Sequence, residues 1–191
     1  MKTKNFFTTL ILLSIISFGL QAAEYKIDTS GMHASVNFKI SHLGTSWMMG
    51  RFDKFEGTYS YEAEKPNESK ISITVDTTSV NTNHAERDSH IRAEGLLNTD
   101  NFSSANFVSD SIVFNTETNG VVKGKLTLHG VEKEVSMDIV KVGEGKDPWG
   151  GYRTGFEGTM TLRLADFGIT RNLGKASETL ELTVMLEGIR Q

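Results

Sequence analysis

Residues 179–188 read TLELTVMLEG, and apolar side chains occur at every second position of this stretch. The apolar members are Leu180, Leu182, Val184 and Leu186. In an extended chain they share one face, because successive side chains of a strand point to opposite faces. Mostly polar residues occupy the other face. The stretch therefore predicts a β-strand with one dry and one solvated side.

The same alternation recurs along most of the chain. Its apolar members include Val36, Phe38 and Ile40, then Ile71, Ile73 and Val75, then Val135, Met137 and Ile139, and finally Phe156, Met160, Leu162 and Leu164. His129 and Gly130 predict a two-residue hairpin turn, because glycine readily adopts a positive φ. Eight or nine strands are expected, roughly at residues 24–28, 33–42, 50–62, 68–76, 106–115, 119–128, 132–142, 152–166 and 178–190. Such strands form either a sandwich or a barrel, and an eight-stranded barrel can hold a small ligand.

Residues 81–92, NTNHAERDSHIR, are the one helix candidate. Asn83 can cap the helix, Glu86 can complete a capping box, and Gly95 is a natural stop. The segment has few apolar residues, so it cannot be a central core helix. We expect it on the surface or over the mouth of a barrel.

His84 and His90 in this segment suggest a metal site, but six helical residues turn through about 600°, which leaves the two rings about 120° apart. His84 with Asp88, or Glu86 with His90, can supply two ligands, whereas zinc sites need three or four. Asp88 and Arg92 have the spacing of a surface ion pair. The sequence shows no nucleophile elbow, phosphate-binding loop or paired-histidine zinc motif. We therefore expect binding rather than catalysis, and no cofactor.

The first 22 residues have the pattern of a signal peptide. Lys2 and Lys4 precede an uncharged run from Phe6 to Leu20, and Ala22 is a suitable last residue before cleavage. The run is shorter than the roughly 20 apolar residues that span a bilayer, so no stable membrane anchor is expected. Residues 23–191 then form a single exported domain.

The charge and cysteine content narrow the function classes. Without the two lysines of the leader, the 20 basic residues fall to 18 against 24 acidic ones, a formal net charge of −6. This balance disfavours a nucleic-acid partner, which would require a basic face. The chain has no cysteine, which excludes disulfides, thiolate metal ligands and thiol nucleophiles.

Several short motifs occur in a characteristic order. They are EYKID at 24–28, VNFKISHLG at 36–44, GRFDKFEGT at 50–58, NHAERDSHIR at 83–92, LTLHGV at 126–131, DPWGG at 147–151 and LADFGIT at 164–170. In this arrangement the chain resembles the YceI family of periplasmic proteins over residues 23–190. The resemblance implies an all-β fold, a lipocalin-like antiparallel eight-stranded β-barrel with one short helix and a long apolar pocket. Members of that family hold a polyisoprenoid or another long-chain amphiphile. The resemblance implies no catalytic activity, and it allows a homodimer.

The leading hypothesis is a periplasmic binding or carrier protein for an isoprenoid or fatty-acid-like lipid. On strand phase, the pocket lining is predicted to include Val36, Phe38, Ile40, Ile73, Phe156, Met160 and Leu162. An anionic head group would require cations near the mouth, and Arg51, Arg87 and Arg92 are the candidates. A buried chain gains about 0.8 kcal/mol for each CH₂ group, so few polar contacts are needed.

Two alternatives stay open. One is an envelope stress protein whose barrel is packed and holds no ligand. The other is an enzyme or metal protein that uses the His84, Asp88 and His90 region. The aromatic-rich residues 46–61 do not decide between these readings, because such side chains fill a core as readily as they line a pliable cavity.

Overall fold

The computed structural model describes residues 22–191 of the chain, so all but the last residue of the predicted signal peptide lies outside the described part. Its strands are β1 (Ala23–Ile27), β2 (Ser35–His42), β3 (Ser46–Phe52), β4 (Phe55–Tyr61), β5 (Lys70–Asp76), β6 (Val80–Asn81), β7 (Ser104–Phe114), β8 (Asn119–Leu128), β9 (Val131–Lys146), β10 (Tyr152–Arg163) and β11 (Thr179–Arg190). Its α-helix is α1 (Ala85–Arg92), and short 3-10 turns lie at Pro66–Glu68, Thr77–Ser79, Leu164–Phe167 and Lys175–Ser177.

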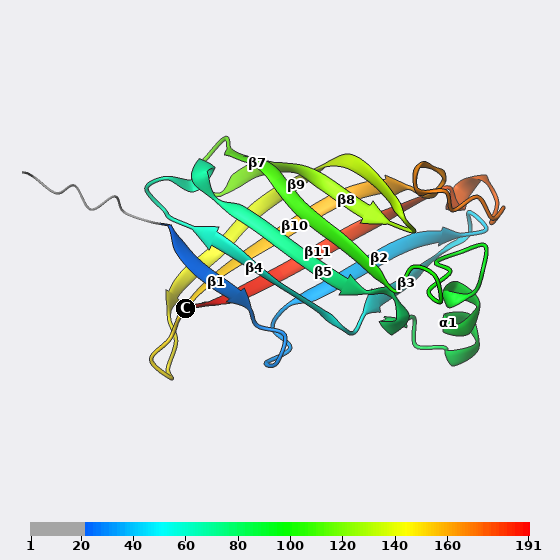
Figure 1. Ribbon diagram of the computed structural model, residues 1–191, viewed down its shortest axis with the longest axis horizontal. Coiled ribbons are helices and arrows are strands. Elements are labelled where there is room, and N and C mark those ends of the chain that lie inside the picture. The colour runs from blue at the N-terminus through cyan, green and yellow to red at the C-terminus, as the bar shows by residue number, and fades with distance from the viewer. Residues whose placement is uncertain (1–21) are drawn as a thin grey trace, which may run out of the picture.

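Eight of these strands close a barrel in the order β1, β4, β5, β7, β8, β9, β10, β11 (Figure 1). Closure occurs because β11 pairs with β10 on one side and with β1 on the other. All the pairings in this ring are antiparallel. The predicted eight-stranded antiparallel barrel with one helix is confirmed.

Strand β11 is long enough to pair with β1 and β2 in succession along the same edge. Ile27 of β1 lies opposite Gly188, and Ser35 of β2 lies opposite Met185. Residues 28–34 leave the sheet between these two pairings. Strand β3 then pairs with β2 and with the short β6, which lengthens the wall towards the end of the barrel where α1 lies (Figure 1).

The structure corrects two of the predicted strands. Residues 50–62 are not one strand, because the chain breaks at Asp53 and Lys54, whose backbone N–H groups donate to the backbone carbonyl and side-chain hydroxyl of Ser79. This break lets β3 pair with β2 while β4 pairs with β1. The strand predicted at 132–142 continues to Lys146, because Gly143 and its successors pair with β10.

The turn between β8 and β9 is the predicted two-residue hairpin. His129 and Gly130 have φ values of 52° and 73°, and two positive φ angles in succession are the mark of a type I′ turn. Inside the barrel, the alternating apolar side chains form two buried clusters, one around Tyr25, Tyr59 and Met137 and the other around Leu126, Leu162 and Phe167.

Helix α1 is short and polar, as predicted, but its cap differs. The cap is His84, whose Nδ1 accepts from the backbone N–H of Arg87, while Asn83 precedes it with a φ of 62°. The predicted ion pair between Asp88 and Arg92 is wrong, because the Asp88 carboxylate is buried and accepts from Thr82 instead. No helix within residues 22–191 is long and apolar enough to cross a membrane.

Asp88 joins α1 to the barrel wall, so its removal should loosen this end of the molecule. Its Oδ1 accepts from both the backbone N–H and the hydroxyl of Thr82, and Thr82 is itself buried. In Asp88→Ala both donors lose their partner, which is expected to lower the free energy of unfolding by about 1 to 2 kcal/mol. Hydrogen exchange should speed up in residues 82–97 and stay unchanged in β8. Equal loss of protection throughout the barrel would contradict a local role.

Candidate binding cavity

The barrel interior holds two adjoining cavities with volumes of about 120 and 160 Å³. Five residues line both of them, namely Val36, Val75, Ala105, Leu126 and Leu182. Because these side chains border both spaces, the cavities meet at this ring, which we call the junction. Ala105 is the smallest member of the junction and leaves the most room there.

The larger cavity lies beside α1. Its lining includes Ile91 of α1, Leu96 and Leu97 after the helix, and Met48 of β3. Every residue that lines this cavity is apolar. The side chains therefore offer no charge or hydrogen bond to a ligand, and an occupant with exposed polar groups would lose its hydration without compensation. The cavity suits hydrocarbon.

The smaller cavity ends against a group of aromatic side chains. Tyr59, Tyr61 and Phe114 line it and pack around Phe156 at ring-centroid distances of 5.6, 5.2 and 6.5 Å. The hydroxyl of Tyr59 donates to the carbonyl oxygen of Thr154 over 2.7 Å, and burial raises the pKa of Tyr59. This tyrosine is therefore neutral and fixed in place. Edge-to-face contacts hold the aromatic group together.

A few polar atoms lie near this aromatic end. The hydroxyl of Ser69 is buried on the cavity lining and has no hydrogen-bond partner among the described residues. The Nζ of Lys141 lies 5.0 Å from the ring centroid of Tyr61 and donates to Glu144 over 2.6 Å. Burial lowers the pKa of Lys141, but the hydrogen bonds to Glu144 and Tyr61 outweigh it, so the pKa lies above its ordinary value. This end thus differs chemically from the all-apolar cavity.

The structure brings the predicted lining residues together. Ile73, Phe156 and Met160 line the smaller cavity, Phe38, Ile40 and Leu162 line the larger one, and Val36 lines both. All come from strands whose period-two pattern turns them towards the barrel axis. Contact of these side chains with a ligand stays a prediction.

The three predicted head-group arginines do not line either cavity. Arg51 is exposed and its Nε donates to Asp53 over 2.7 Å. Arg87 donates to the hydroxyl and the carbonyl oxygen of Thr82 over 2.7 and 2.6 Å, so its guanidinium stabilises the start of α1. Arg92 is half-buried. Head-group binding by these residues stays a prediction.

The lining also contains residues that sequence reasoning missed. Leu96 and Leu97 follow Gly95, where the pattern predicted only the end of a helix. Leu126 belongs to the junction. The sequence predicts a strand at 119–128 but does not assign Leu126 to its inner face. The spacing of Val122 and Leu126 along that strand places both on one face, and this signal could have identified them.

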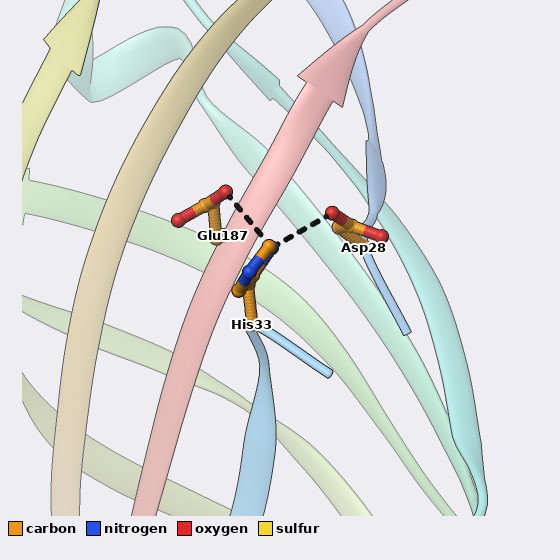
Figure 2. Close-up of side chains that lie close together, drawn as sticks. All are labelled: Asp28, His33 and Glu187. Carbon is orange, nitrogen blue, oxygen red and sulfur yellow. Dashed lines mark hydrogen bonds and ion pairs between the residues drawn. The ribbon is translucent and has the colours of Figure 1, made fainter. Parts of the chain in front are cut away.

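The histidines of α1 do not form a metal site with Asp88, because the His84 ring caps the helix and the Asp88 carboxylate bonds Thr82. Within residues 22–191, the one group of three histidine or acidic side chains close enough to share an ion is Asp28, His33 and Glu187 (Figure 2). Their potential ligand atoms lie within 4.8 Å of one another. One histidine and two carboxylates are a ligand set that zinc or iron accepts.

Arg153 already binds these carboxylates. Its Nη1 donates to Asp28 over 2.7 Å and to Glu187 over 2.6 Å, and its Nε donates to Asp147 over 2.8 Å. The guanidinium holds the pKa of Asp28 well below its usual range and also lowers the pKa of Asp147. A metal would have to displace this arginine from the same oxygen atoms. The geometry therefore favours an ion-pair network over a metal centre.

Comparison with known proteins places these features in context. A family model described as a YceI-like domain matches residues 25–188. A UPF0312 protein of Ectopseudomonas mendocina is 53% identical over 189 residues, which cover 98% of this chain and 99% of that protein. A UPF0312 protein of Shewanella baltica is 48% identical, with the same coverage.

Solved structures share the fold at lower identity. Burkholderia cenocepacia BcnA is 17% identical with a TM-score of 0.74, and the match covers 84% of this chain and 98% of that one. The Campylobacter jejuni YceI protein is 22% identical with a TM-score of 0.72, covering 80% and 91%. A polyisoprenoid binding domain from Saccharophagus degradans is 18% identical with a TM-score of 0.64, covering 90% and 100%.

Proposed function

Because this chain belongs to the YceI-like domain family, and because its barrel encloses two adjoining apolar cavities, we propose that it is a periplasmic binding or carrier protein for a long-chain lipid. The observation that carries the proposal is the all-apolar lining of the larger cavity. An isoprenoid is the favoured chain, and a fatty-acid-like chain is the alternative. A packed barrel without ligand, as in the stress-protein hypothesis, would require no such space.

The physical basis of binding is the transfer of hydrocarbon from water. Each CH₂ group that enters the cavities contributes about 0.8 kcal/mol, and no polar group in the larger cavity has to be satisfied. Chain length would then set affinity more than any specific contact. The printed description of the Saccharophagus degradans neighbour as a polyisoprenoid binding domain supports the isoprenoid as ligand.

Ligand identity can be tested on protein purified from a periplasmic extract. Native mass spectrometry is expected to show an additional mass that organic solvent extracts as an apolar lipid. The same sample should begin at Ala23, as cleavage of the predicted signal peptide requires.

The control is the delipidated protein, which should regain one equivalent of a long isoprenoid alcohol and ignore a soluble sugar phosphate. Protein that carries no lipid, and that takes up no isoprenoid, quinone or fatty acid after delipidation, would overturn the proposed function.

A further inference from the structure

Three segments meet at the end of the barrel beside the larger cavity. Figure 1 shows α1, the β2–β3 hairpin and the loop that leads into β11 at this end, opposite the C-terminus. The hairpin and the loop touch, because the Ser177 hydroxyl donates to the carbonyl oxygen of Ser41 over 2.6 Å. Met48 of the hairpin and Leu173 of the loop both line the larger cavity. These two segments therefore border the cavity directly.

Large apolar side chains on the same two segments face solvent. Leu43 is 71% exposed, Trp47 60%, Met49 66% and Leu173 37%. We call these four residues the rim. Leu43 stands at the hairpin tip with a φ of 56°, a conformation that a bulky residue seldom adopts. A group of exposed apolar side chains next to a cavity marks a surface for interaction rather than one for solvent.

The two segments that carry the rim have a net positive charge, opposite in sign to that of the whole chain. Residues 36–52 and 167–177 contain no acidic residue, whereas the full sequence has 24 acidic against 20 basic residues. Lys39 is paired with Glu181 and stacks over the Trp47 ring at 4.5 Å. Arg171 and Lys175 are exposed and make no ion pair within residues 22–191. Asp166 and Glu178 flank the loop but lie outside this acid-free stretch.

The opposite end of the barrel provides a comparison. Val142 and Trp149 are also exposed there, by 72% and 78%. Their surroundings are acidic, because Asp28, Asp147 and Glu187 are opposed by the single guanidinium of Arg153. Apolar exposure is thus common to both ends, and Lys146 and Arg190 at the opposite end are also exposed without an ion pair within residues 22–191. What distinguishes the rim is that the two segments that carry it, residues 36–52 and 167–177, contain cations and no acidic residue.

We propose that the rim docks on an anionic lipid bilayer, with Leu43 and Trp47 inserted at the interface and Arg171 and Lys175 against the head groups. Tryptophan prefers the membrane interface, and each lysine or arginine near an anionic surface strengthens binding. Docking would place the end of the barrel that holds the larger cavity against the lipid that supplies the chain. Entry of a lipid chain into the cavity after docking rests on the proposed function, whereas binding of the rim to vesicles does not.

Vesicle binding can be followed with the two tryptophans of the chain as separate reporters. Trp149→Phe leaves Trp47 at the rim, and its emission should shift to the blue on addition of vesicles of phosphatidylglycerol and phosphatidylcholine. Trp47→Phe leaves Trp149 at the other end, and its emission should not move. Vesicles of phosphatidylcholine alone should give a much smaller shift with either variant.

Charge and apolar insertion are tested separately by sedimentation with the same vesicles. Arg171→Gln with Lys175→Gln should weaken partitioning about fivefold per cation, hence roughly 30-fold together. Leu43→Ser should also weaken it, whereas Val142→Ser at the opposite end should have no effect. Circular dichroism and uptake of a soluble isoprenoid alcohol should stay unchanged in all of these variants, which separates loss of docking from loss of folding or of cavity binding.

Two results would overturn the proposal. One is equal partitioning of the wild type and the Arg171 and Lys175 double variant on anionic vesicles. The other is that the protein does not bind vesicles while Leu43→Ser changes its oligomeric state in gel filtration, which would mean that the rim joins two copies of the chain. Either result would leave the proposed lipid-binding cavity untouched.

Discussion

Ala105→Phe is expected to abolish binding of a long isoprenoid while leaving the barrel folded. Ala105 lines both cavities at the junction and lies opposite Val75 in the pairing of β5 with β7. A phenyl ring there would occupy the space through which one chain reaches both cavities. We call this ring the plug. If it keeps about five methylene groups of the ligand out of the cavities, affinity should fall on the order of 1,000-fold, at about 0.8 kcal/mol for each group.

The loss of affinity in Ala105→Phe should depend on the chain length of the ligand. A short alcohol such as geraniol, which can occupy one cavity alone, should keep most of its affinity, whereas solanesol should lose it. Titration calorimetry or displacement of a fluorescent fatty acid gives both values. Val108→Phe is the matched control, because Val108 is on the same strand but is 51% exposed. Leu182→Phe places a second plug at the junction from β11, in case Ala105→Phe does not fold. If Ala105→Phe and Leu182→Phe both fold and both keep the solanesol affinity of the wild type, the ligand does not span the junction.

Strand phase was sufficient to predict the cavity wall because it is a local property. In β2, the alternation of Val36, Phe38 and Ile40 with polar residues places all three on the inner face, whatever the strand pairs with. The same holds for Phe156 and Met160 in β10. Whether the interior is filled or hollow depends on the size of side chains that meet from different strands. Ala105 shows this, because its importance at the junction appears only once β7 stands opposite the other walls.

Long-range contacts explain what the sequence could not predict. Asp88 has ideal helical spacing for an ion pair with Arg92, yet its carboxylate turns inward to the buried Thr82. The burial of that end of α1 outweighs a surface ion pair, which contributes only a few tenths of a kcal/mol. Arg153 and Asp28 are far apart in sequence and meet only because β10, β11 and β1 are neighbours in the closed barrel.

Arg153→Met is expected to be the most destabilising single change outside the core. Arg153 donates to three carboxylates, which come from β11, from the loop before β10 and from the residue that follows β1. The side chain of Asp28 is 4% exposed, so it would lose its main partner without gaining water. The free energy of unfolding should fall by roughly 2 to 4 kcal/mol, since breaking a buried pair leaves a charge unpaired. Urea denaturation at pH 8 measures the loss.

The same substitution should flatten the acid sensitivity of the protein. The pKa of Asp28 is lowered in the folded state, chiefly by Arg153, so its carboxylate stabilises the fold above the ordinary aspartate pKa of about 3.9. That contribution is lost as the pH falls below about 5 towards the lowered folded value, because the unfolded chain binds the proton first. Stability of the wild type should therefore decline more steeply between pH 5 and pH 3 than that of Arg153→Met. Arg163→Met, an exposed arginine on the same strand, should match the wild type within about 0.5 kcal/mol at every pH. Parallel pH profiles for the wild type and Arg153→Met would show that this network does not couple folding to acid.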